Sequence, residues 1–458
     1  MQDALIYNSD DTICAISTAP GTGGIAVARV SGHNAITIVS KIWKGKNLND
    51  VASHSAHLGI VYDSNGEILD EAVATVFRNP NSFTGEDVVE LSIHGSRWIQ
   101  SQLIQSLITA GCRMALPGEF TRRAFAAGRL DLAQAEAVAD VISSSSKAAH
   151  RMAMSQMRGA FSKKIDAMRD ELVQLASLLE LELDFSEEDV EFASRNRLLE
   201  IADTLSAQLK RAAASFRAGQ AIKDGIPVAI VGNTNAGKSS LLNALVEDDR
   251  AIVSDIHGTT RDVVEDTIEI GEYLIRFQDT AGLRQTEDPI EQLGIERSHS
   301  VASAANIVIY VVDSSIASNP EETARELPHI DIIVANKTDL PQQFDSATWQ
   351  KVYPTATILP CSARNGKGID TLRQTICDLL RADTSEDDII VANARHAQSL
   401  AEAAANLEAL SAALRNGIPT DLAAQDLRAA IHHLSTITGT ITTPEILQNI
   451  FKNFCIGK

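Results

Sequence analysis

A glycine-rich run at residues 232–239, GNTNAGKS, has the spacing G-x-x-x-x-G-K-[ST]. Glycines let backbone N–H groups crowd around phosphate oxygens, and a helix N-terminus behind the loop adds favourable partial charge. Lys238 would reach the β- and γ-phosphates, and the Ser239 hydroxyl would ligate Mg²⁺. The flanking runs PVAIV and SSLLNALV predict the strand and the helix that such a loop needs. This context favours a nucleotide-phosphate site over a glycine-rich turn with a chance lysine.

Three further segments follow in order, each after an apolar run. The D-x-x-G run at residues 279–282 can hold magnesium through its aspartate and sense the γ-phosphate through its glycine N–H. The NKTD run at 336–339 ends in Asp339, whose carboxylate can accept hydrogen bonds from N1–H and the exocyclic amine of guanine. Adenine offers no such pair of donors, and an unpaired buried polar group costs about 1–3 kcal/mol. Residues 362–364, SAR, would contact guanine O6 through a backbone N–H. The four segments together predict a site for GTP and GDP.

Between the first two segments lies GTTRD at residues 258–262, where a switch loop belongs. A threonine there can complete the Mg²⁺ shell when a γ-phosphate is present; the alternative is a pair of threonines that caps the next strand. Some related switches place a glutamine after D-x-x-G to orient the attacking water, but here the position is Leu283. Glu291 and Glu296 are candidates for that task by position.

The predicted guanine-nucleotide contacts extend along these loops. They are Asn235, Ala236, Gly237, Lys238, Ser239, Ser240, Ser254, Asp255, Ile256, His257, Gly258, Thr259, Thr260, Asp279, Thr280, Ala281, Gly282, Asn336, Lys337, Asp339, Ser362, Ala363 and Arg364.

The elements that must position these loops are strands alternating with helices. Between about 222 and 382, runs such as NIVIYVVD and DIIVANK alternate with helical spacing, which predicts a doubly wound, mostly parallel sheet. Residues 1–125 also read as an α/β domain. The stretches 126–220 and 383–458 are rich in Ala, Leu and Glu and predict long helices. We therefore expect a helical domain interrupted by an inserted P-loop domain at 221–382.

Composition narrows the function classes. The chain has 458 residues, which suggests about three domains, and a formal net charge of −20. That negative charge argues against a protein that binds nucleic acid through a basic face of its own. Five scattered cysteines favour a reducing, cytoplasmic setting. The apolar runs are too short to span a membrane, and the first residues do not resemble a signal peptide.

Longer runs carry a more specific resemblance. They include GGIAVARVSG, NSFTGEDVVEL, PGEFTRRAFAAGRLDLAQAEAVAD, the GTTRD loop, the leucine after DTAG and the terminal CIGK. With a P-loop domain inserted among helices, the chain resembles the MnmE (TrmE) family of tRNA modification GTPases over essentially its whole length.

The resemblance implies a GTPase whose potassium ion replaces an arginine finger. Asn235 would be the side-chain ligand of K⁺, and Ser254, Ile256 and Thr259 would complete its coordination. By the same alignment, Thr260 joins Ser239 in sensing Mg²⁺, and Glu291 helps to orient the hydrolytic water.

The resemblance further implies an N-terminal domain that forms a homodimer and binds a reduced folate, 5,10-methylenetetrahydrofolate, for which 5-formyltetrahydrofolate is an analogue. Its contacts would be Arg29, Glu90, Arg129 and Lys458; the family often has lysine where this chain has Arg129, which keeps the cation but changes its geometry. Read from the residues alone, these side chains are ordinary strand-edge charges. Cys455 is either a nucleophile or a packed small residue.

The implied partner is an FAD-bearing protein, MnmG (GidA), in a heterotetramer or larger complex. Together the pair would add an aminomethyl-type group to C5 of the wobble uridine, U34, of tRNA. The incoming amine and the set of tRNAs stay open. One alternative is a regulatory or ribosome-assembly GTPase switch, but the long N-terminal domain and the Cys-x-Gly-Lys tail have no place in it. An ATP-driven motor or transporter subunit is opposed by NKTD.

Overall fold

The structure is a computed structural model. It describes residues 11–184, 195–247, 267–278, 301–382, 389–416, 418, 420–452 and 454–457. Two compact units divide the chain, the first formed by residues 1–142, 154–203 and 405–458 and the second by 143–153 and 204–404. The boundaries of these two units differ from those of the four segments predicted from the sequence, 1–125, 126–220, 221–382 and 383–458. The four predicted boundaries stay a prediction.

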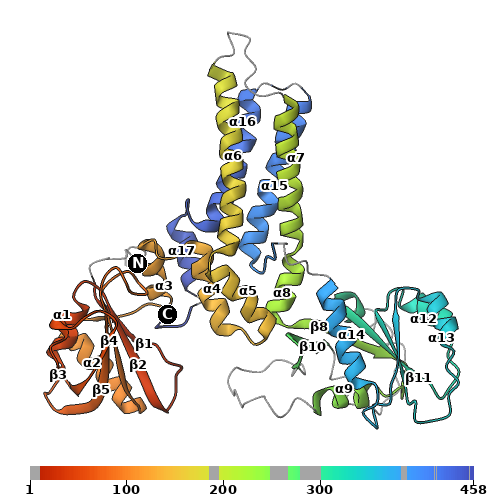
Figure 1. The fold of residues 1–458 in the computed structure, drawn as a ribbon, viewed down its shortest axis with the longest axis horizontal. Helices are drawn as coiled ribbons and strands as arrows, with labels where there is room; N and C mark the ends of the chain where they lie inside the picture. Colours follow the sequence, from red (N-terminus) through yellow and green to blue (C-terminus); the bar gives the residue numbers. More distant parts are fainter. Residues whose placement is uncertain are drawn as a thin grey trace. The chain divides into compact units, whose positions relative to one another are not determined.

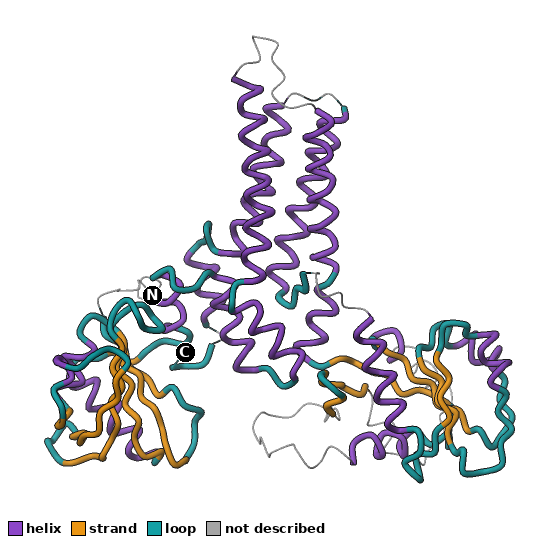
Figure 2. Tube along the Cα trace, viewed as in Figure 1, coloured by secondary structure: helices purple, strands orange, loops and turns teal. Residues whose placement is uncertain are grey.

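The first unit contains a seven-stranded sheet with the order β3-β4-β5-β6-β2-β1-β7, drawn as orange strands in Figure 2. All neighbouring strands are antiparallel except β1 and β7, which run parallel. The strands are β1 (Ile13–Ile16), β2 (Gly23–Ser31), β3 (Trp43–Gly45), β4 (Ser55–Tyr62), β5 (Ile68–Phe77), β6 (Val88–Gly95) and β7 (Arg113–Met114).

Along β5 and β6, buried residues alternate with more exposed ones, so one face of the sheet is buried. That face packs against α1 (Ala35–Lys41) and α2 (Arg97–Ala110), whose Leu103 and Leu107 are fully buried. A short 3₁₀ helix, η1 (Leu48–Asp50), and helix α3 (Glu119–Ala126) complete the domain. The predicted N-terminal α/β fold is confirmed.

The helical residues divide between the two units. The helices are α4 (Leu132–Ser143), α5 (Lys147–Met157), α6 (Ala160–Asp184), α7 (Arg195–Ala214), α8 (Phe216–Asp224), α15 (Ala394–Arg415), α16 (Thr420–Thr438) and α17 (Pro444–Phe451). Helices α6 and α16, far apart in sequence, lie side by side in the first unit (Figure 1). Helices α7 and α15 are tied by an ion pair between Asp203 and Arg415 and by a hydrogen bond from Ser206 to the Ala404 carbonyl. Helices from both sides of the insertion therefore pack together, as the sequence predicts.

The second unit is built on a six-stranded sheet with the order β13-β12-β11-β8-β10-β9. All of its strand pairs are parallel except β10 with β9, so the expected mostly parallel sheet is confirmed. Its elements are β8 (Ile226–Gly232), α9 (Lys238–Glu247), β9 (Thr267–Ile270), β10 (Tyr273–Gln278), β11 (Ile307–Asp313), α12 (Pro320–Glu326), β12 (Ile332–Asn336), α13 (Ser346–Val352), β13 (Thr357–Pro360) and α14 (Ile369–Ala382).

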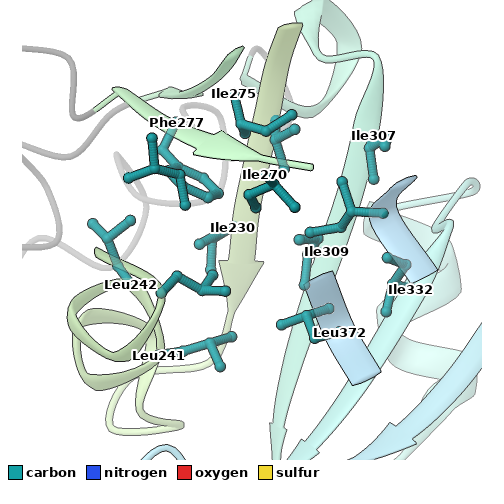
Figure 3. Close-up of a cluster of buried hydrophobic side chains, with 14 of the residues drawn as sticks. Ile230, Leu241, Leu242, Ile270, Ile275, Phe277, Ile307, Ile309, Ile332 and Leu372 are labelled. Atoms are coloured by element: carbon teal, nitrogen blue, oxygen red, sulfur yellow. The ribbon is translucent and has the colours of Figure 1, made fainter. Parts of the chain in front are cut away.

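Both faces of this sheet are covered. On one, strand residues such as Ile230, Ile309 and Ile332 face Leu241 of α9 and Leu372 of α14 (Figure 3). The other face packs around Trp349 of α13. Strands buried on both faces read as continuous apolar runs, which is why IPVAIVG and IVIYVVD contain almost no polar residue.

Candidate functional site

The glycine loop lies between β8 and α9, where the sequence predicts it. Gly232 ends β8 at φ 143°, and a side-chain β-carbon there would lie 2.3 Å from the Val311 carbonyl oxygen. Gly237 has φ 94°, and a β-carbon would lie 2.3 Å from Asn336 Nδ2. Both positions therefore require glycine, because a side chain would collide with the backbone of β11 or with the Asn336 side chain at the end of β12.

Lys238 begins α9, and its ammonium is folded onto the loop. Nζ donates to the carbonyl oxygens of Gly232 at 2.7 Å and Asn233 at 2.8 Å. Burial lowers the pKa of Lys238, so this cation gains from a nearby anion such as a phosphate. Ser239 and Ser240 are exposed on the first turn of α9, within the partial positive charge of the helix N-terminus.

Asn336, at the end of β12, ties two loops together. Its side chain is buried; Nδ2 donates to the Ala236 carbonyl at 2.9 Å, and Oδ1 accepts from the Ala363 N–H at 3.0 Å. The glycine loop and the SAR loop are thus held in register by one amide. These bonds agree with the amide orientation, because its NH₂ group faces a carbonyl acceptor and its oxygen faces an N–H donor.

Asp339 is exposed, and its carboxylate is held by a hydrogen bond from the Ser362 hydroxyl at 2.7 Å. This bond, with smaller contributions that include Arg364 and Lys337, keeps the pKa of Asp339 below its ordinary value. Ser362 itself is buried, and its N–H donates to the Lys367 carbonyl. An ionised, oriented and accessible carboxylate is the acceptor that the guanine edge needs.

The four strand ends explain why these loops meet. Strands β8, β11, β12 and β13 are parallel neighbours, so Gly232, Asp313, Asn336 and Pro360 all lie at the same edge of the sheet. Ligands of open α/β sheets bind outside the carboxyl ends of their strands. Asp313, which ends the apolar run IVIYVVD, is not among the residues predicted from the sequence.

Several predicted residues lie outside the described part of the chain. They are Ser254, Asp255, Ile256, His257, Gly258, Thr259, Thr260, Asp279, Thr280, Ala281, Gly282, Leu283, Glu291, Glu296 and Lys458. Their roles stay predictions.

A second candidate site lies on the sheet of the first unit. Arg29 of β2 and Glu90 of β6 are register partners, and Arg29 Nη2 lies 2.8 Å from Glu90 Oε1. The guanidinium carbon of Arg29 also lies 5.4 Å from the ring centroid of Phe83 and 5.6 Å from that of Phe120. Both charged side chains are partly exposed, and the aromatic rings fix the cation in place. The two aromatic contacts were not foreseen from the sequence.

Arg129 is exposed after α3, and it lies against the loop that carries Phe83. At Gly85, whose φ is 78°, a β-carbon would lie 2.9 Å from Cβ of Ala127 and 3.4 Å from Cγ of Arg129. The loop at residues 82–86 therefore touches both predicted cations, Arg29 through Phe83 and Arg129 through Gly85.

Arg123 carries its charge in the interior of the first unit. Its side chain is buried, and it forms ion pairs with Glu86 and with Glu119. Arg113 also pairs with Glu119; burial raises the pKa of that carboxyl, but hydrogen bonds from Arg113 and the Leu116 N–H hold it below its ordinary value. This network is structural, so it provides no basic patch for a nucleic acid.

The C-terminal tail is fastened to the N-terminal domain. The Ser17 hydroxyl donates to the Gly457 carbonyl at 3.1 Å, and the Gly118 N–H lies 3.4 Å from the Cys455 carbonyl. Phe451 and Phe454 pack beside Gly118, and Cys455 is exposed. Gly457 has φ 96°, and a β-carbon there would lie 2.3 Å from the Ile16 carbonyl. The tail is therefore held closely by the end of β1.

The parallel sheet, its glycine loop and the NKTD and SAR loops at one edge define a guanine-nucleotide-binding P-loop domain. Two family models match the chain: "GTP-binding protein TrmE N-terminus" at residues 12–129 and "MnmE helical domain" at residues 132–455. Among the described helices, none combines the length and apolarity that a membrane span requires.

Full-length relatives agree with these matches. The tRNA modification GTPase MnmE of Parabacteroides distasonis is 48% identical, covering 98% of this chain and 100% of its own. That of Porphyromonas gingivalis is also 48% identical, over 98% of each chain. A GTP-binding protein of Sulfolobus solfataricus, solved with GDP, aligns with 47% of this chain and 68% of its own at 19% identity and a TM-score of 0.26. On the sequence matches, the chain belongs to the MnmE (TrmE) family and is a GTPase of tRNA modification.

Proposed function

We propose that this GTPase, activated by potassium, drives the addition of an aminomethyl-type group to C5 of the wobble uridine of tRNA. The one-carbon unit comes from a reduced folate, and an FAD-bearing partner of the MnmG type completes the chemistry. Among the described contacts, the fastening of the C-terminal tail to the N-terminal domain at Ser17 and Gly457 carries this proposal. A GTPase switch alone has no use for a tail held in this way.

At the nucleotide, Lys238 and the N-terminus of α9 meet the phosphates, and Asp339 reads the guanine edge. Mg²⁺, held by Ser239 and Thr260, would stabilise charge on the phosphate oxygens. Asn235 is exposed at φ 62° in the glycine loop, so its side-chain oxygen is available to a monovalent cation. Ser254, Ile256 and Thr259 would supply the other K⁺ ligands, and Glu291 would orient the attacking water.

At the N-terminal sheet, the donor set fits a ligand with both a planar ring and carboxylates. Glu90 can accept from ring N–H groups, and the partly exposed guanidinium of Arg29 can pair with a carboxylate or a ring acceptor. Arg129 brings a second cation to the same loop. Gly457 lies against Ser17 and Ile16. Lys458, the next residue in the sequence, would add a third cation. A reduced folate has the ring and the carboxylates that these groups require.

The net charge of −20 supports a division of labour in which the partner supplies much of the basic surface for tRNA. The aromatic and aliphatic side chains exposed on the first unit, among them Ile25, Leu58 and Trp98, suit a homodimer formed through the N-terminal domain.

Calorimetry with 5-formyltetrahydrofolate tests the folate part of the proposal. The full-length protein should bind, and Arg29→Ala should weaken binding about tenfold or more, because a hydrogen bond to a charged group contributes about 1.5–3 kcal/mol. Arg97→Ala, an exposed arginine at the start of α2, is the matched control and should bind normally. A full-length protein that binds no folate would refute this part.

A further inference from the structure

Lys337 of the NKTD loop is held by a residue outside every predicted contact. Its Nζ lies 2.6 Å from Oδ2 of Asp313, and the two side chains are 32% and 13% exposed. The ammonium is therefore pulled back towards the end of β11. A partly buried ion pair of this length is a fixed arrangement rather than a passing surface contact.

The carboxylate of Asp313 is oriented by Ser315 as well as by the lysine. Its Oδ1 accepts from the Ser315 N–H at 3.0 Å and from the Ser315 hydroxyl at 2.6 Å, which leaves Oδ2 for Lys337. Burial raises the pKa of Asp313, but the hydrogen bonds from Lys337 and Ser315 more than offset it, so the carboxyl is ionised at neutral pH. Because Asp313 and Asn336 are register partners, the loops after β11 and β12 are neighbours.

The loop after β11 also binds the backbone of the NKTD segment through hydrogen bonds. The N–H and the hydroxyl of Ser314 both donate to the Asn336 carbonyl, at 2.9 Å and 2.5 Å. Lys337 has φ 63°, a left-handed conformation that a residue with a side chain adopts only when its surroundings hold it there. Residues 313–315 therefore fix both the backbone and the side chain at this point.

The ion pair with Asp313 determines the position of the Lys337 ammonium. Lys337 is two residues from Asp339 and is already among the smaller influences that lower the pKa of that carboxyl, behind the Ser362 hydrogen bond. If the ammonium were released, the nearest alternative anion in its own loop is Asp339, and an ion pair there would compete with the guanine N1–H and amine.

We infer that Asp313 is a positioning residue for guanine recognition, which holds the ammonium of Lys337 away from Asp339. This inference rests on the proposed contact between Asp339 and guanine. The aliphatic stem of Lys337, stretched between its backbone and Asp313, then presents a fixed apolar edge beside the base site. The carboxylate of Asp339 stays free to accept from the base.

A double-mutant cycle for GDP and IDP binding, measured by calorimetry, tests this role. Asp313→Asn should weaken GDP about tenfold, which is about 1.4 kcal/mol. It should also reduce the preference for GDP over IDP, since IDP lacks the exocyclic amine that Asp339 would bind. In a Lys337→Met background, which keeps the stem but removes the charge, Asp313→Asn should have little further effect on either quantity.

Additive losses in the cycle, or an unchanged GDP/IDP ratio in Asp313→Asn, would overturn the inference. Ser315→Ala loosens Asp313 without removing its charge and should give a smaller change in the same direction, which keeps the test valid if Asp313→Asn folds poorly. Asp345→Asn is the control, because either residue can cap α13. A guanine-to-xanthine switch in Asp339→Asn reports separately on the proposed base contact.

Discussion

Replacing Asn336 by alanine removes a side-chain amide that joins the glycine loop to the SAR loop. The change deletes two hydrogen bonds, one to the Ala236 carbonyl at 2.9 Å and one from the Ala363 N–H at 3.0 Å. Each is a neutral bond with a net contribution of about 1 kcal/mol, so the arrangement that binds nucleotide should lose about 2 kcal/mol. That loss corresponds to about 30-fold weaker binding of GDP.

The assay is calorimetry or stopped-flow fluorescence with a labelled GDP, together with thermal unfolding. Asn319→Ala is the matched control: it removes the cap of α12, in which Asn319 Oδ1 accepts from the Glu321 N–H. The control should lose about 1 kcal/mol of stability and keep its nucleotide affinity. If Asn336→Ala bound GDP within about twofold of the parent, the bridging role derived from these distances would be wrong.

Four further changes test the guanine contact, the attacking water, the potassium site and the C-terminal tail. Asp339→Asn should weaken GTP and favour xanthosine nucleotides, whose O2 can accept from the new amide; unchanged discrimination in a competition assay would contradict this. Glu291→Ala should bind GTP normally but hydrolyse it about 10²–10⁴-fold more slowly in single-turnover assays, and near-normal hydrolysis would shift attention to Glu296. Hydrolysis should be faster in K⁺ than in Na⁺ at equal ionic strength, and Asn235→Ala should abolish the difference; equal rates in the two salts would refute the potassium site. Gly457→Ala should release the tail and weaken folate binding, but GTP hydrolysis should stay nearly intact. Gly66→Ala, at a positive φ with open space around it, is the control and should leave the tail, folate binding and GTP hydrolysis unchanged.

The nucleotide loops were predictable because each motif is contiguous and stands next to its own strand. An apolar run followed by G-x-x-x-x-G-K-[ST] or NKTD determines both the element and the loop, and parallel strands bring such loops to one edge. The N-terminal strands were predictable for a similar reason, since β2 is rich in apolar residues and β6 alternates apolar and more polar residues.

Contacts between distant segments could not be predicted in the same way. The cation of Arg29 lies near Phe83 and Phe120, and the pairing of Asp313 with Lys337 depends on β11 and β12 being neighbours. The ion pair between Arg123 and Glu86 joins residues that are 37 positions apart in the chain, so a local window does not reveal it. The attachment of Gly457 to Ser17 spans 440 residues. Such contacts depend on the order of the strands in the sheet and on the course of the C-terminal tail, and neither can be derived from short stretches of sequence.

Nucleoside mass spectrometry of tRNA shows whether GTP turnover by this protein drives the modification of wobble uridine. A strain that lacks this protein should accumulate wobble uridine without its C5 substituent. The parent gene should restore the modification, but a Lys238→Ala version, unable to hold the phosphates of GTP, should not. If the deletion strain kept its full C5 modification, or if the Lys238→Ala protein restored it, the claim that GTP turnover by this chain drives wobble-uridine modification would be contradicted.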